Sequence, residues 1–240
     1  MDRAVVKKRT GTRDRIVRAA AELLDEAGRE AVSTRAVANA AGVQAPTIYR
    51  QFGDMRGLLD AVAAHGFSEY LRGKRSREQA EDPVEDLRRG WDLHVEFGLA
   101  NPALYKLMYG DPRPGAGSTA ALEASEILHG LVSRVAEAGR LRVGVERAAG
   151  MIHAAGMGVV LSLIATVPED RDPVLSESAR EAVLAAVTTD AVAEEAPGND
   201  RVARRSVALK AVLSEAGDEL TSSETALLSE WLDRLADRPG

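Results

Sequence analysis

The chain has 240 residues, 45% hydrophobic and 28% charged, which is the composition of an ordinary soluble globular protein. It contains no cysteine, which excludes a disulfide framework and a Cys-ligated zinc site and is consistent with a reducing cytoplasm. The N-terminus is basic, but no apolar run follows it, so no secretory signal peptide is expected. The expected location is therefore the cytoplasm.

The net charge of −6 is unevenly distributed. Residues 1–57 hold 11 Lys and Arg against 7 Asp and Glu, whereas residues 58–240 hold 20 against 30. A basic N-terminal part favours a polyanionic partner such as nucleic acid, although a solvated basic tail would have the same composition.

Almost every segment has the period of an amphipathic helix, and no convincing alternating strand is found. This pattern predicts an all-α fold. The first helix is expected at about residues 13–27, with Thr12 as its cap and Gly28 at its end.

Two short helices separated by a tight turn should follow. Ser33 can cap the first with its hydroxyl group, and Gly42 can end it because glycine adopts the left-handed conformation at little cost. Pro46 suits the first turn of the second helix. Ile48 and Phe52, four residues apart, should point into the core. The residues left facing outward are Thr47, Tyr49, Arg50 and Gln51.

The remaining sequence predicts further helices and punctuating loops. Helices are expected near 54–75, 83–99, 103–110, 119–139, 145–167 and 174–190. Pro and Gly cluster in the loop at 110–117, and residues 193–200 should form a connection. Two amphipathic stretches follow, the last opening with the capping-box pattern TSSE at 221–224.

One segment has the length of a membrane-spanning helix. Residues 148–168 contain no charged side chain, but eight of them are Ala or Gly, and His153, Ser162 and Thr166 are polar. A helix buried between other helices fits this composition better than a membrane span, which is the alternative.

Residues 33–54, STRAVANAAGVQAPTIYRQFGD, resemble the helix-turn-helix of tetracycline-repressor (TetR) family regulators. The AAGV turn, the Tyr49-x-x-Phe52 pair and the Leu58-Leu59 pair all lie at the family's spacing, and the resemblance covers roughly residues 12–60. It implies an N-terminal arm and three-helix DNA-binding domain at residues 1–53. It also implies a larger helical ligand-binding and dimerisation domain at 54–240, with two extra C-terminal helices from about residue 199.

Three positions depart from the family pattern. Gln44 stands where a capping Ser or Thr is common, and Gln51 stands where a His usually precedes the Phe. Met55 replaces a Lys that touches phosphate in the family, so the resemblance leaves that contact to the neighbouring Arg56.

A helix in the major groove reads base edges with side chains near its N-terminus, while neighbouring groups contact phosphate. Thr47 can bond a base or pack on a thymine methyl group, and Arg50 can reach the backbone or pair with guanine. The alternatives are a Tyr49 ring that is partly buried and a Thr47 hydroxyl bonded to its own helix. The expected DNA-binding residues are Arg9, Arg13, Ser33, Thr34, Gln44, Ala45, Pro46, Thr47, Tyr49, Arg50 and Arg56.

Signals for other chemistry are weak. The four histidines have no metal-ligand spacing, no serine lies in a nucleophile elbow, and no Gly-rich phosphate loop follows a strand. No enzymatic activity, metal site or cofactor is therefore expected.

An effector pocket is implied by the resemblance. Trp91 and His94, three residues apart, can share a helix face, and Trp and Met side chains suit an adaptable apolar cavity, although each also suits plain core. The expected pocket residues are Trp91, His94, Tyr105, Met108, His129, His153 and Met157.

Dimerisation has a clearer pattern. Small residues at four-residue spacing on the helix near 145–167 allow two helices to approach closely, although packing within one subunit would select the same pattern. The expected interface residues are Gly150, Ala154, Gly158, Leu161, Ala165, Val183 and Val187.

These patterns favour a homodimeric repressor that binds a palindromic double-stranded DNA operator and is released by a small-molecule effector, with no membrane partner. An activator of the same design would look alike. The alternatives from other classes are a helical DNA-binding protein without an effector and an interaction module that kept the fold but lost DNA binding.

Overall fold

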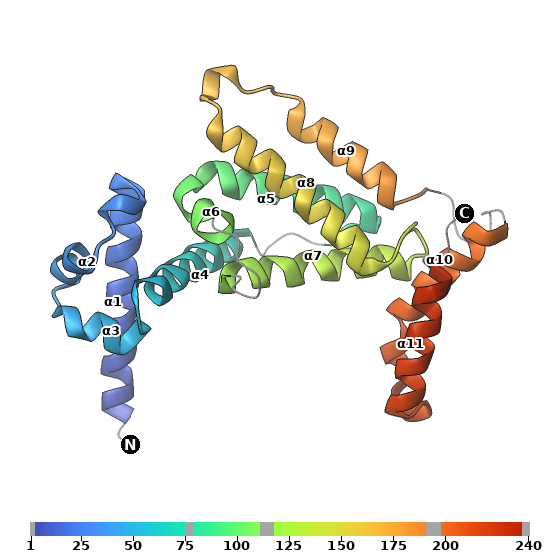
Figure 1. The fold of residues 1–240 in the computed structure, drawn as a ribbon, viewed down its shortest axis with the longest axis horizontal. Helices are drawn as coiled ribbons and strands as arrows, with labels where there is room; N and C mark the ends of the chain where they lie inside the picture. Colours follow the sequence, from blue (N-terminus) through green and yellow to red (C-terminus); the bar gives the residue numbers. More distant parts are fainter. Residues whose placement is uncertain (1–2, 75–78, 111–117, 191–197, 237–240) are drawn as a thin grey trace. The chain divides into compact units, whose positions relative to one another are not determined.

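The computed structural model describes residues 3–74, 79–110, 118–190 and 198–236 of the chain, and these residues are helical almost throughout, as predicted (Figure 1). The α-helices are α1 (Arg3–Ala27), α2 (Thr34–Ala41), α3 (Ala45–Phe52), α4 (Met55–Lys74), α5 (Pro83–Ala100), α6 (Pro102–Tyr109), α7 (Thr119–Glu137), α8 (Val145–Ala165), α9 (Leu175–Val187), α10 (Gly198–Ala211) and α11 (Ser222–Ala236). Short 3-10 helices include η1 (Arg29–Ala31), η2 (Pro168–Asp170) and η4 (Leu213–Glu219).

The chain packs into two compact units. The first comprises residues 1–77 and 100–123, and the second comprises residues 78–99 and 124–240. This division differs from the boundary expected at residue 53, because α4 packs on α1 and α3, and α6 packs in turn on α4 and α1. The first unit therefore includes two helices beyond the three of the expected DNA-binding domain.

The core of the first unit holds the three N-terminal helices together. Ile16 of α1, Val37 of α2 and Ile48 of α3 are fully buried in one cluster with Leu58 and Val62 of α4. These positions follow the helical period, so one apolar stripe from each helix builds the cluster. Figure 1 shows α2 lying against α1, while α3 packs on α2 and α4.

Helix α1 begins at Arg3, earlier than the expected start at residue 13. Thr12 therefore lies inside the helix instead of capping it. Ala, Lys and Arg are strong helix formers, and their propensity outweighs the free-energy cost of Gly11 inside the helix. Gly28, with φ 73°, ends the helix as predicted.

The second unit is built around α5, α7, α8 and α9. Gly90 of α5 faces Leu131 of α7, and α8 packs on α9. Arg88 of α5 donates two hydrogen bonds to the carboxylate of Glu181 of α9, with N–O distances of 3.0 Å for Nη2 and 3.1 Å for Nε. Such forked pairs hold two helices in a defined orientation.

Among the described helices, α8 has the length and hydropathy needed to cross a membrane. Its buried face includes Ile152, Val160 and Leu163. Packing of this face on the rest of the unit is what a core helix of a soluble protein shows, and it agrees with the interpretation preferred from sequence.

The C-terminal helices α10 and α11 pack on each other. The capping box at the start of α11 is formed as predicted: the Thr221 N–H donates to the Glu224 carboxylate at 2.8 Å, and the Glu224 N–H donates back to the Thr221 hydroxyl at 3.3 Å. Leu227 and Trp231 of α11 are about half exposed. The loop expected at 110–117 and most of the connection expected at 193–200 lie outside the described residues.

Candidate nucleic-acid interface

The turn between α2 and α3 has the geometry of a helix-turn-helix. The Ser33 hydroxyl accepts a hydrogen bond from the Ala36 N–H at 3.2 Å and caps α2, as predicted. Gly42 has φ 60° and ψ 43°, the left-handed conformation that L side chains rarely adopt. The Val43 N–H then donates to the Ala38 carbonyl at 2.9 Å, which closes the turn, and the Val43 side chain packs on the core.

Helix α3 presents one apolar and one polar face. Pro46 lies in its first turn, where a missing N–H leaves no bond unmade, while Gln44 precedes the helix without a side-chain cap. Ile48 is fully buried and anchors the helix to the core. The end of α3 is set by Gly53, whose φ of 78° again requires glycine.

The outward face of α3 carries a connected polar surface. The hydroxyl groups of Tyr49 and Thr34 lie 3.2 Å apart, which links α3 to the start of α2, and Arg50 donates to the Thr47 hydroxyl at 3.4 Å. The Tyr49 ring is 49% exposed, so it is not the buried ring that was the alternative. Thr34 with Tyr49 and Thr47 with Arg50 thus form two polar pairs. Of their sequence neighbours, Ser33 and Pro46 are exposed and Ala45 is half-buried.

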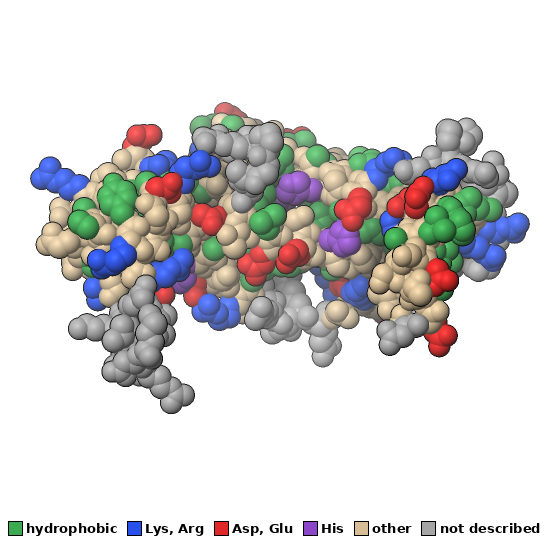
Figure 2. Space-filling model, turned by 60° about the horizontal axis from the view of Figure 1, so that its bottom comes forward, with side chains coloured by type: hydrophobic (Ala, Val, Ile, Leu, Met, Phe, Trp, Pro, Cys, Tyr) green, Lys and Arg blue, Asp and Glu red, His purple; other side chains and the backbone are tan. Residues whose placement is uncertain are grey.

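Basic side chains surround this surface, and Figure 2 shows several of them over helices α1–α3, at the left of the view. The Arg13 guanidinium lies 5.0 Å from the centre of the Phe52 ring at the end of α3. Arg56 is exposed in the first turn of α4, a turn that the Asp54 carboxylate caps by accepting from the Gly57 N–H at 2.8 Å. The side chain of Arg9 lies outside the described residues.

Two arginines were not singled out from the sequence. Arg15 donates to the Ala41 carbonyl at 3.0 Å and so fastens α1 to the end of α2. Arg35 is exposed in the first turn of α2, beside Thr34. The basic patterning of residues 1–57 indicated such contacts in general but not which side chains make them.

Comparison with known proteins identifies this arrangement. The family of bacterial regulatory proteins named for tetR matches residues 16–62, which span α1 to α4. The tetracycline repressor protein class C of Escherichia coli is 45% identical over 51 residues, covering 21% of this chain and 23% of the repressor. The class A repressor from transposon 1721, also of Escherichia coli, is 46% identical over 48 residues, covering 20% and 22%.

Residues 16–62 therefore carry the DNA-binding region of the TetR family. The chain's resemblance to these curated repressors spans less than a quarter of their length, and beyond residue 62 the likeness is one of fold. A TetR protein from Streptomyces coelicolor superposes with a TM-score of 0.55 at 22% identity, covering 72% of this chain and 92% of its own. A TetR protein of Acinetobacter baumannii, solved in complex with minocycline, gives a TM-score of 0.52 at 21% identity, covering 70% and 89%. The family that matches residues 16–62 is one of bacterial regulatory proteins.

Three of the residues expected in an effector pocket gather in the second unit. Gly156 of α8 lies against the rings of Trp91 and His94 of α5, so that a methyl group there would be 3.5 Å from each. Burial lowers the pKa of His94 to about 4, and repulsion from His153 adds to the shift. Burial also lowers the pKa of His153. Both rings are therefore neutral at pH 7, and a polar but uncharged pair lies beside the indole of Trp91.

Trp91 is held by a polar contact as well as by packing. It is 4% exposed, and its indole Nε1 donates to the Ser176 hydroxyl of α9 at 3.1 Å. Met157, which follows Gly156, is half-buried.

The other expected pocket residues are placed differently. Tyr105 and Met108 are buried in α6, within the first compact unit and not in the unit that holds Trp91. His129 is a correction: its side chain is 46% exposed, and its Nε2 atom is 2.8 Å from the Glu146 carboxylate. His129 therefore lies on the surface beside an acidic residue and does not line the proposed pocket.

The stripe of small residues on α8 faces outward. Gly150, Ala154, Gly158 and Ala165 are exposed and Leu161 is half-buried, and no heavy atom lies near the space that a side chain at Gly150 or Gly158 would occupy. On α9, Val183 is half-buried. Val187 is a second correction, because it is fully buried inside its own subunit, where its carbonyl accepts from the Arg142 N–H at 2.8 Å. Its apolar character serves the core and leaves nothing for a partner to contact.

Proposed function

We propose that this protein is a homodimeric repressor that binds a palindromic DNA operator through α3 and leaves it when a small-molecule effector binds. The polar surface on α3 carries this proposal, because Thr47, Tyr49 and Arg50 project from a helix that Gly42 and Ile48 hold in the helix-turn-helix geometry. The contacts proposed for these side chains are base edges for Thr47 and phosphates for Arg13, Arg50 and Arg56. The proposed location is the cytoplasm.

Dimerisation follows from the need for selectivity and from the exposed stripe on α8. One helix-turn-helix contacts too little DNA to select a site among many. The small residues Gly150, Ala154 and Gly158 leave room for a second backbone, and a two-fold pairing would place two reading helices on an inverted repeat.

The effector is proposed to bind beside Trp91, His94 and His153. The A. baumannii protein with the same fold binds minocycline, which supports a small-molecule site in this fold. Trp91 also contacts α9 through Ser176, so a ligand that moves the indole would act on a helix next to the proposed dimer face. Binding that favours a different spacing of the two reading helices would lower the affinity for the operator.

The test of DNA binding is selection of bound fragments from genomic DNA, followed by titration at several salt concentrations. Arg50→Ala should lower the slope of log affinity against log salt by about one, because one phosphate contact is lost. Thr47→Ala should change the preferred sequence more than the salt slope. Lys210→Ala, a change at a cation that pairs with Asp233 in the C-terminal helices, serves as the control. An Arg50 variant that matches the parent in affinity and slope would show that α3 is not the reading helix.

The dimer is tested by Gly158→Leu. A Cβ atom at position 158 would meet no atom of its own subunit, and a leucine there would insert bulk between two α8 helices, where overpacking costs about 1–3 kcal/mol. Sedimentation should therefore show weaker dimerisation, by about 5- to 150-fold. Gly130→Leu, at an equally open glycine on α7, should leave the dimer intact. A parent that sediments as a monomer at micromolar concentration would remove the dimer from the proposal.

The effector site is tested by fluorescence in a Trp231→Phe background, in which Trp91 is the remaining tryptophan. An effector found by its release of operator DNA should change the Trp91 emission over the same concentration range. Trp91→Phe keeps most of the packing but removes the bond to Ser176, and it should weaken the response to the effector while leaving DNA affinity within about tenfold, which is about 1.4 kcal/mol. An effector that releases DNA without altering the emission of Trp91 would place its site elsewhere.

A further inference from the structure

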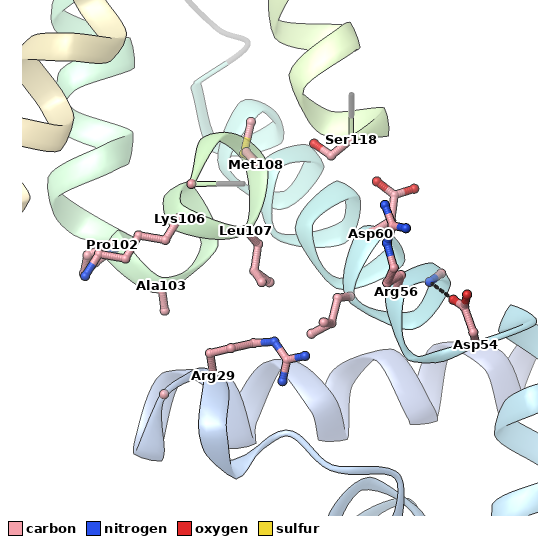
Figure 3. Close-up of a pocket in the computed structure, with 14 residues that line it drawn as sticks. Arg29, Asp54, Arg56, Asp60, Pro102, Ala103, Lys106, Leu107, Met108 and Ser118 are labelled. Carbon is pink, nitrogen blue, oxygen red and sulfur yellow. Dashed lines mark hydrogen bonds between the residues drawn. The ribbon is translucent and has the colours of Figure 1, made fainter. Parts of the chain in front are cut away.

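A groove of about 1020 Å³ lies on the first compact unit (Figure 3). Its walls come mainly from three segments that are distant in sequence, with Ser118 in addition: Gly28 and Arg29 directly after α1, Asp54 with the first turns of α4, and α6 with Gly110. Because all three belong to one unit and pack on a shared core, the groove is a preformed feature of that unit. Its volume is ample for a small organic molecule.

The floor of the groove is apolar. Leu59 of α4 and Met108 of α6 are buried, and Ala103 and Leu107 of α6 pack on the core cluster of the N-terminal helices. Such a floor favours a ligand with a hydrocarbon body, because covering apolar surface is the main source of affinity in small-molecule sites.

The charged groups at the groove are unequally engaged. Asp54 caps α4, and Asp60 accepts hydrogen bonds from the backbone N–H and the hydroxyl of Thr119, at 2.8 Å and 2.7 Å. Both carboxylates are therefore committed to helix starts. By contrast, none of the cations Arg29, Arg56 and Lys106 has an acidic partner within the part of the chain that the structure describes, and Arg29 donates only to the Val32 carbonyl, at 3.3 Å.

The position of Arg29 makes its charge available to a ligand. Figure 3 shows its side chain reaching from the end of α1 into the space between α6 and the start of α4. A guanidinium group beside an apolar floor matches a carboxylate that carries a hydrocarbon chain, since the fork of N–H donors fits two carboxylate oxygens.

We propose that this groove binds an amphipathic carboxylate, with Arg29 holding the acid group and Leu59, Leu107 and Met108 covering the chain. The site is separate from the effector position beside Trp91, which belongs to the other unit. Arg56 lies at the same groove and is also a proposed phosphate contact. A carboxylate that engages Arg56 would therefore compete with DNA phosphate for this side chain and weaken DNA binding. This effect on DNA rests on the proposed function; the binding of the carboxylate in the groove does not.

The test is calorimetric titration of the full-length chain with decanoate, and with decanol and inorganic phosphate as the two partial probes. We expect one decanoate per chain, with decanol and phosphate each binding at least tenfold more weakly. Arg29→Gln should weaken decanoate about tenfold, while Arg29→Lys should retain part of the affinity. Arg18→Gln, at an exposed arginine of the preceding helix α1 that does not line the groove, is the control and should bind as the parent does.

Thermal melting of the Arg29 variants separates loss of the charge from loss of the fold. Ala103→Phe adds bulk to the groove without removing a charge, and it should weaken decanoate binding by an independent route. Equal binding of decanoate and decanol, or decanoate binding that survives both Arg29→Gln and Ala103→Phe, would overturn the proposal. Absence of decanoate binding at millimolar concentration would overturn it as well. Failure of the parent to bind any DNA without decanoate would count against the proposed function and leave the titration result standing.

Discussion

Replacing Asp86 with alanine is expected to lower the free energy of unfolding by about 3–5 kcal/mol, because it leaves the Arg134 guanidinium of the second unit without its buried acidic partner. The Asp86 carboxylate is 8% exposed, accepts the Ala80 N–H at 2.9 Å and pairs with the Arg134 guanidinium of α7. Arg134 also donates to the Ala80 carbonyl at 3.4 Å, so the pair fastens the start of α5 to α7. Since the Arg134 side chain is 29% exposed, the lower end of the range is expected.

Urea denaturation measures this loss, and Asp92→Ala on the same helix is its matched control. Asp92 also pairs with an arginine, Arg180, but its side chain is 58% exposed, and exposed pairs contribute about 0.2–1 kcal/mol. Equal losses in the two variants would show that burial of the Asp86 pair is not what stabilises the junction.

The contribution of Asp86 should also depend on pH. Burial alone would raise the pKa of Asp86, but the hydrogen bond from Ala80 and the guanidinium of Arg134 outweigh it and hold the pKa below its usual value of 3.8. The unfolded chain therefore binds the proton at a higher pH than the folded chain does. The stabilisation is present above pH 4 or so and is lost as the pH falls through the lowered pKa, so the difference between parent and Asp86→Ala should shrink in acid. A difference that is constant from pH 7 to pH 3 would contradict this origin.

Replacing Ile48 with alanine should lower the free energy of unfolding by about 2–5 kcal/mol. It should also abolish DNA binding, because α3 loses the side chain that anchors it to the core. Ile48 is fully buried and joins α3 to the core formed by α1, α2 and α4. Loss of its side chain leaves a cavity in the core. The turns at Gly42 and Gly53, which both have positive φ angles, fix the two ends of α3 and limit how far the helix can move to fill that cavity.

Tyr49→Phe is the control for this prediction. It changes the next residue of the same helix but removes only a half-exposed hydroxyl and its contact with Thr34, so its cost should be below about 1 kcal/mol. Denaturation and DNA titration of the two variants should therefore diverge. Loss of DNA binding by Tyr49→Phe at unchanged stability would instead identify the Tyr49 hydroxyl as a direct contact.

The helix-turn-helix could be predicted from the sequence because its signals are local. The cap at Ser33, the left-handed turn at Gly42 and the buried Ile48 each depend on a few neighbouring residues, and the structure confirms all three. The start of α1 was predicted wrongly, at residue 13 instead of Arg3, and there the competing signals were also local: Thr12 as a possible cap against the helix propensity of the residues before it.

What only the tertiary structure decided is which side chains from distant helices meet. Apolar periodicity marks one face of a helix as buried but does not say against what, and so Val187 was assigned to a dimer face although it lies in the core of its own subunit. His129 could be recognised as a surface residue only once Glu146 was seen beside it. The groove between Arg29 and Leu107, and the pair of Asp86 with Arg134, join segments separated by tens of residues. Such contacts arise from helix packing, which depends on the shapes of both partners and is not contained in the period of either one.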